Sequence, residues 1–125
     1  MYSHMMVGSN DIDRSKKFYD ATFTAMGGKA GIQDEKGRLI YMNNGGLFIV
    51  TKPIDGNPAT AGNGCTIGIA MSPEQADAWH EAGVAAGGTA IEDPPGVREG
   101  GFGKLYLAYL RDPDGNKLCA LNRMG

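Results

Sequence analysis

The sequence is poor in the features that mark secreted, membrane-spanning and nucleic-acid-binding proteins. It has only two cysteines, far apart and with no Cys-x-x-Cys pair, so neither a disulfide framework nor a zinc ribbon is expected. No apolar run approaches the roughly 18 residues that a membrane span needs, and residues 1–10 show no basic, apolar signal segment. The net charge is -2, and basic residues cluster only at 14–17. We therefore expect a cytoplasmic protein that binds neither membranes nor nucleic acid.

What the chain does have is an ordinary apolar content of 42% and 20 glycines, several of which fall in adjacent pairs. Two of its segments also repeat one pattern. Residues 4–30 and 66–90 follow one plan: a short apolar strand, a polar cap, an amphipathic helix, then a Gly-Gly pair and a further strand. This duplication predicts one domain over residues 1–125 with a shared core. Its modules span about 1–52 and 64–125, joined by a connector at about 53–63 that could form a flap over a pocket.

Both helices can be placed from their caps. Ser72 is a strong N-cap, and Gln75 completes a capping box with it, which predicts a helix over about 73–86. The corresponding first helix is predicted over about 12–25, capped by the Asn-Asp pair before it.

Strand-like runs separated by turn residues follow each helix, so each half reads βαβββ. Asp112-Pro113-Asp114-Gly115 favours a type I turn between the last two strands. A helix covers only one face of such a sheet. The sequence therefore predicts an α+β fold with curved mixed sheets around a concave interior, which suits a ligand.

With these elements placed, the sequence resembles the vicinal oxygen chelate superfamily, the glyoxalase, bleomycin-resistance and extradiol-dioxygenase group. The residues that carry the resemblance are the opening strand with His4, "NDIDRSKKFYD" (10–20) and the closing "GKLYLAYLRDPDGNKL" (103–118). The resemblance implies paired βαβββ modules, a homodimer and a small-molecule ligand. In the metal-using members, four inward side chains bind one divalent ion.

The resemblance places those four metal ligands at His4, Thr66, Cys119 and either Ile49 or Phe48. Isoleucine cannot ligate, a threonine hydroxyl is a poor ligand, and a hard octahedral ion needs oxygen and imidazole donors. The metal site is therefore expected to be degenerate, with no cofactor or a single divalent ion held by His4 and Cys119.

Three interpretations of Cys119 stay open. Strand alternation points it to the concave side, where His4 could lower its pKa and make it a catalytic nucleophile. It could instead share a zinc ion with His4, or be a small apolar filler, as free cysteines often are. His4 itself is either a general base or ligand, or a hydrogen-bonded pocket histidine.

Substrate contacts are expected from the loop at 92–109 and from strand aromatics. Arg98 could clamp a carboxylate or phosphate. At least one of Tyr41, Tyr106 and Tyr109 should line the cavity, and alternation puts Tyr106 and Tyr109 on opposite faces. The predicted substrate-binding residues are Arg98, Tyr41, Phe48, Thr66, Tyr106 and Lys104.

Two functions fit these observations. The first is a glyoxalase-like protein, related to lactoylglutathione lyase, that acts on or binds a small oxygenated compound with His4 and Cys119. Without a metal, that chemistry would lack the stabilisation of its enediolate. The alternative is a metal-free, bleomycin-resistance-like protein that sequesters a small aromatic or cationic molecule. Its inward side chains would be Tyr41, Phe48, Glu99 and Phe102.

Overall fold

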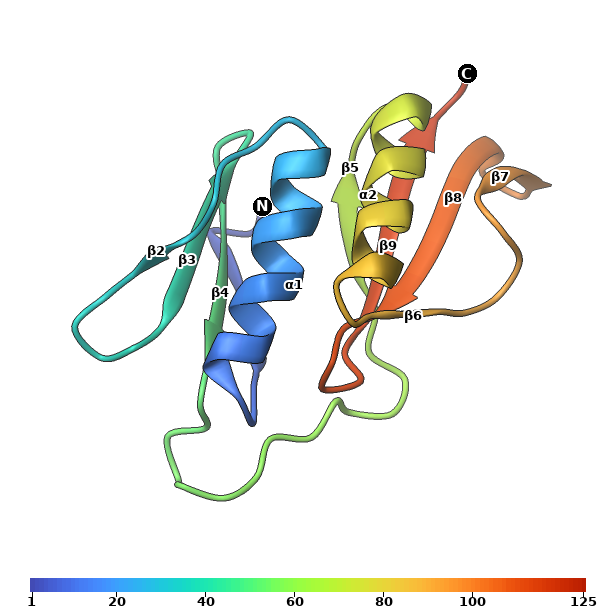
Figure 1. Cartoon of the computed structure of the whole chain (residues 1–125). Coiled ribbons are helices and arrows are strands. Elements are labelled where there is room, and N and C mark those ends of the chain that lie inside the picture. Colours follow the sequence, from blue (N-terminus) through green and yellow to red (C-terminus); the bar gives the residue numbers. More distant parts are fainter.

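The computed structural model describes all residues, 1–125, as two modules, each of which consists of a strand, a helix and further strands (Figure 1). The first module contains β1 (His4–Gly8), α1 (Ile12–Ala25), β2 (Ile32–Gln33), β3 (Leu39–Asn43) and β4 (Gly46–Thr51). The second contains β5 (Ile67–Ala70), α2 (Pro73–Ala85), β6 (Thr89–Ala90), β7 (Gly96–Gly100), β8 (Gly103–Arg111) and β9 (Lys117–Arg123).

Each module forms its own mixed sheet. The first has the order β1-β4-β3-β2, and the second has the order β5-β9-β8-β6 with β7 also paired to β8. In both, the strand before the helix pairs parallel to the last strand, and the other pairs are antiparallel. The predicted α+β duplication is confirmed, with one addition: residues 96–100, expected to be loop, form β7.

Both helices begin and end close to where their caps predict. Asp11 caps α1 through a hydrogen bond from the Arg14 amide. Ser72 accepts from the Gln75 amide, and the Gln75 side chain accepts from the Ser72 amide, so the capping box is complete. Neither helix is long and apolar enough to cross a bilayer.

One core joins the two modules. The helices lie side by side in Figure 1, and residues of both helices and both sheets form a single buried cluster. In the first module, the ring of Tyr41 stacks on Phe23 with centroids 4.7 Å apart, and Tyr19 lies 5.1 Å from Phe48. In the second, Trp79 and Leu110 are fully buried. Because the helix-facing sides of both sheets share this core, their other faces point outward.

The Asp112–Gly115 turn forms as predicted, with the Gly115 amide donating to the Asp112 carbonyl at 2.9 Å. It also ties the second module to the first. The carboxylate of Asp112 is buried and accepts from the Tyr19 hydroxyl at 2.5 Å. Asp114 pairs with Arg14 at 2.8 Å. The turn is therefore an intermodule contact as well as a hairpin.

Candidate functional site

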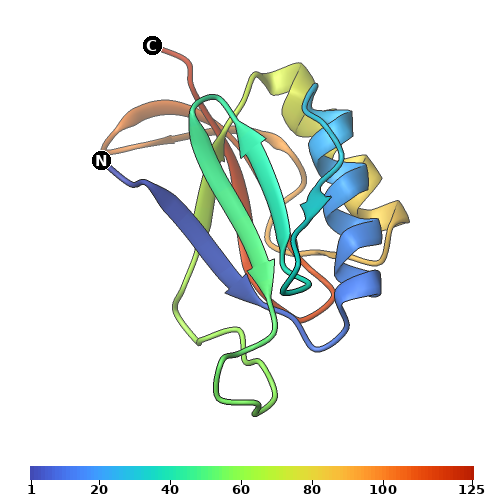
Figure 2. The same cartoon turned by 90° about the vertical axis from the view of Figure 1, so that its left-hand side faces the viewer.

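Each sheet has one face that no helix covers, and Figure 2 shows this face of the first sheet turned toward the viewer. Alternation and strand register define the two faces. Face A, on the first sheet, consists of His4, Met6, Ile32, Ile40, Met42, Leu47 and Ile49. Face B, on the second sheet, consists of Arg98, Leu105, Leu107, Tyr109, Arg111, Lys117, Cys119, Leu121 and Arg123.

Face A is apolar and open to solvent. Met42 is 63% exposed and Ile32 is 58% exposed. Its methionine side chains are flexible. Its one polar side chain is His4, which is exposed and whose Nδ1 lies 2.8 Å from the Ser3 hydroxyl. A continuous apolar sheet face of this kind marks a surface for a partner or a ligand.

Face B combines apolar side chains with positive charge. Tyr109 and Cys119 are direct cross-strand neighbours on β8 and β9. The Lys117 ammonium lies 5.0 Å from the centre of the Tyr109 ring and also pairs with Glu92. Cys119 is only 5% exposed although no helix covers it, so neighbouring side chains of the same sheet shield it.

The thiol of Cys119 is a neutral group. Burial raises the pKa of Cys119, and the charge of Glu92 adds to this, although the Tyr109 hydroxyl, Lys117 and Arg98 oppose it. His4 is not among the groups that act on it, since the two residues stand on different sheets. Within one chain, the structure therefore does not bring His4 and Cys119 together, and the thiol is not activated.

Two predicted substrate-binding aromatics point away from face A. Tyr41 and Phe48 are buried in the core on the helix side of the first sheet, and the Tyr41 hydroxyl donates to Asp20 at 2.7 Å. They border a cavity of about 240 Å³ between the first sheet and β5. The register also decides between Ile49 and Phe48 as the face A residue, and it is Ile49.

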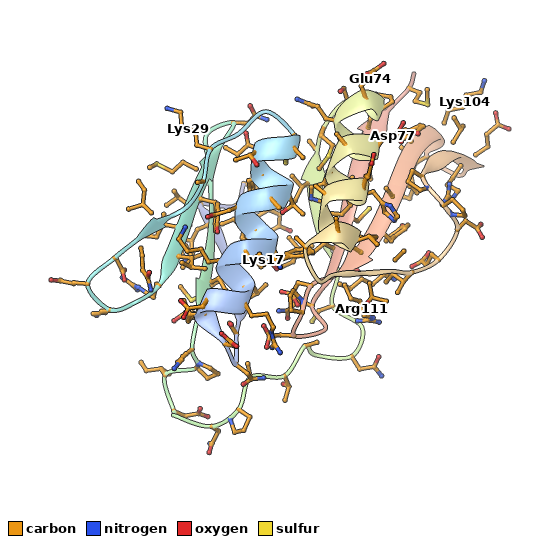
Figure 3. The ribbon with its side chains drawn as sticks, viewed as in Figure 1. Lys17, Lys29, Glu74, Asp77, Lys104 and Arg111 are labelled. Atoms are coloured by element: carbon orange, nitrogen blue, oxygen red, sulfur yellow. The ribbon has the colours of Figure 1, made fainter.

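Tyr106, predicted to bind substrate, points to the helix side of the second sheet. Its hydroxyl donates at 2.6 Å to Asp77, which lies on α2 (Figure 3). Tyr109, which was absent from the predicted substrate-binding residues, lies on face B. The signal was present, because a hairpin closed at 112–115 pairs residue 109 with residue 119.

The remaining predicted residues lie at the margins or on face B. Arg98 stands on β7 opposite Leu105. Lys104 is exposed at the opposite end of β8 from Arg111 (Figure 3), and its ammonium lies 3.7 Å from the Glu99 carboxylate. Thr66 is exposed just before β5. Phe102, at the β7–β8 hairpin, is 88% exposed. His80 on α2 is partly buried, and burial lowers the pKa of its imidazole.

The donor set does not fit the divalent ion of the metal-using relatives. Faces A and B together offer one imidazole and one thiol, with no carboxylate, and Ile49 presents only hydrocarbon. No group of three or more His, Cys, Asp or Glu side chains gathers anywhere in the chain.

Part of the connector lines a cavity. Residues 52–55 and 58–60 line an open groove of about 1250 Å³ together with the end of β1, the start of α1 and the β2–β3 turn. The backbone at Gly8 runs directly beneath it, because a Cβ there would lie 2.8 Å from Cβ of Ala59. The groove extends face A toward the connector.

The chain matches a family and several solved structures. The family model for the Glyoxalase/Bleomycin resistance protein/Dioxygenase superfamily matches residues 2–120. A crystal structure of a glyoxalase/bleomycin resistance protein from Albidiferax ferrireducens T118 is 58% identical, with a TM-score of 0.94, and covers 98% of this chain and 99% of that one. Among curated proteins, none matches this chain.

More distant structures share the fold. A hypothetical protein from S. aureus is 19% identical, with a TM-score of 0.73, over 98% of this chain and 94% of that one. A glyoxalase-related enzyme from Fulvimarina pelagi is 20% identical, with a TM-score of 0.71, over 97% of this chain and 86% of that one. Both support the paired-module architecture.

Proposed function

Because the chain belongs to the glyoxalase/bleomycin resistance protein/dioxygenase superfamily, we propose that it is a homodimeric protein that binds a small organic molecule without a metal ion. The observation that carries this proposal is the pair of uncovered sheet faces. One is almost wholly apolar, and the other is apolar with a tyrosine and basic side chains. Neither is covered within one chain.

A second copy can cover both faces at once. Face A of one chain against face B of its partner repeats by symmetry on the other side, so the dimer closes without leaving an unpaired face. Apolar contacts such as Met42 and Leu47 against Leu107 and Leu121 would supply the association energy. The space left between the two curved sheets is the proposed ligand cavity, with His4 from one chain and Cys119 from the other.

Binding is favoured over glyoxalase-type isomerisation for a chemical reason. Proton abstraction beside a carbonyl needs an electrophile to hold the developing enediolate. The faces offer no carboxylate set that would hold a divalent ion in that place, and the Cys119 thiol is neutral. The side chains present can enclose and orient a molecule, with the His4 imidazole as the one ordinary acid–base group.

The test is the assembly state together with ligand response. We expect the wild-type protein to sediment as a dimer at micromolar concentration and to be stabilised by small aromatic compounds in thermal-shift assays. Met42→Lys places a charge on face A at its most exposed strand methionine, and should give a monomer without that response. Val84→Lys, on an exposed position of α2, is the matched control and should change neither.

A monomeric wild-type protein that still responds to ligands would contradict the shared cavity. Turnover of a hemithioacetal in the presence of divalent metal ions would contradict metal-free binding and would show that the protein is a glyoxalase-like lyase.

A further inference from the structure

Face B carries positive charge that its own strands do not balance. The central strands β8 and β9 contain no aspartate or glutamate. The one carboxylate that reaches a basic residue of the face is Glu92, which pairs with Lys117. The guanidinium groups on this face form no ion pair, and they belong to Arg98, Arg111 and Arg123.

Arg98 is the guanidinium that hydrogen bonds hold in place, on the edge strand β7 opposite Leu105. Its Nη2 donates to the carbonyls of Asp93 and Pro94, each at 3.0 Å, which holds the side chain against the segment just before β7. Its Nη1 and Nε atoms have no acceptor in the protein. Arg98 is also partly buried, and its charge lowers the pKa of both Tyr109 and Cys119.

The other two arginines are less suited to a ligand in the middle of the face. Arg111 lies at the turn end of β8 (Figure 3), and its Nη1 donates to the Gly115 carbonyl at 2.8 Å. Arg123 ends β9 and is exposed. Arg98 is thus the one guanidinium of face B that is partly buried, held by hydrogen bonds and left with free donors.

The apolar part of face B suits a flat or branched apolar group. Tyr109 offers its ring, while Leu107 and Leu121 are cross-strand neighbours next to it. The opposing face A would add methionine side chains, which adapt to aromatic surfaces. A guanidinium with free donors beside an apolar surface matches a carboxylate with an apolar body better than it matches a cation.

We propose that the ligand is a small organic carboxylate, with its carboxylate on the free donors of Arg98 and its aromatic or aliphatic body on Tyr109 and Leu121. This inference rests on the proposed function, because a second copy completes the cavity. It agrees with the role that the sequence suggested for Arg98 and narrows the alternative prediction of an aromatic or cationic molecule to an anionic one.

The experiment uses three probes of the same shape and different charge: phenylacetate, phenylacetamide and phenethylamine. Calorimetry with the full-length dimer should show that phenylacetate binds at least about tenfold more tightly than the amide, because the neutral amide lacks the charge-assisted hydrogen bond to Arg98. The amine should bind most weakly, because its positive charge is repelled by the guanidinium. Arg98→Gln should remove this preference without changing the affinity for the amide, and Arg98→Lys should keep part of it. Lys29→Gln, an exposed change of the same charge on the first module, should leave it intact.

The outcomes separate the two proposals. Equal affinity for the carboxylate and the amide, or a preference that survives in Arg98→Gln, overturns carboxylate recognition by Arg98 and leaves the cavity standing. If none of the three probes binds to the dimer at millimolar concentration, the proposed binding function fails together with the inference.

Discussion

At the scale of single residues, the fold depends on buried polar pairs whose charge state is fixed. Tyr19 is fully buried, and its hydroxyl donates to the carboxylate of Asp112. Burial raises the pKa of Tyr19 well above its ordinary value, and the negative charge of Asp112 raises it further. The phenol therefore stays protonated in the folded protein, where a phenolate would place a second negative charge beside Asp112.

This predicts alkaline destabilisation that depends on Tyr19. The unfolded chain releases the proton near pH 10, whereas the folded chain keeps it, so the free energy of unfolding falls as the pH rises above about 10. The contribution is fully present below that pH. Urea unfolding of Tyr19→Phe should show a smaller decline between about pH 9 and 11, because one such proton is missing. At neutral pH the variant should lose roughly 1–2 kcal/mol, since Asp112 loses a donor.

Tyr2→Phe is the control, because Tyr2 is exposed, and it should reproduce the wild-type decline. A decline in Tyr19→Phe as steep as that of the wild-type protein would show that this phenol does ionise in the folded state.

At the scale of elements, a glycine allows α2 to approach its neighbours closely. Gly83 is buried in the middle of the helix. A Cβ at this position would lie 2.4 Å from Leu110 Cδ1 and 3.2 Å from Thr22 Cγ2, and both of those side chains are fully buried. The helix can therefore pack against α1 and β8 only without a side chain at this point.

Gly83→Ala should destabilise the protein although alanine is the better helix former. The propensity gain is about 1 kcal/mol, and forcing a methyl group into a filled core costs typically about 1–3 kcal/mol. We expect a net loss with a lower melting temperature in circular dichroism. Val84→Ala, next to it but exposed, should be neutral or slightly stabilising. A more stable Gly83→Ala variant would mean that the helix moves away from β8 at no cost.

The local elements were predictable because their signals lie within a few residues of one another. The capping box of Ser72 and Gln75 and the turn at Asp112 both form as the sequence indicates. The sequence does not show why position 83 needs a glycine, because the neighbours of Gly83 come from α1 and β8. The same holds for Asp112, whose bond to Tyr19 joins residues 93 positions apart.

At the scale of the whole molecule, strand alternation predicts the face on which a residue lies but not how the two sheets are arranged. Alternation correctly put Cys119 on the face opposite Leu118 and Ala120, which lie in the core. The sequence does not reveal that the helices share a core, which leaves faces A and B on the uncovered sides of two separate sheets. His4 and Cys119 therefore lie on different sheets. Their placement depends on how the two modules pack, and no short-range pattern encodes that packing.

The shared core also predicts that the two modules unfold together. Phe18 and Tyr19 of the first module belong to the same buried cluster as Trp79 and Leu110 of the second. Polar contacts cross the same boundary, such as the bond from Asn116 Nδ2 to the Gly8 carbonyl at 3.1 Å. Neither module alone could cover these groups, so neither has an independent core.

Native-state hydrogen exchange can test this cooperativity. The amides of Val50 on β4 and Ala120 on β9 are central to their sheets, and both residues are fully buried. If the modules form one unit, their slowest exchange should require the same opening free energy and the same denaturant dependence. A fragment of residues 64–125 should not fold alone, because Leu110 and Trp79 would lose their contacts with α1. Opening free energies that differ by more than about 1 kcal/mol between the two sheets, or a folded fragment, would make each module a separate folding unit.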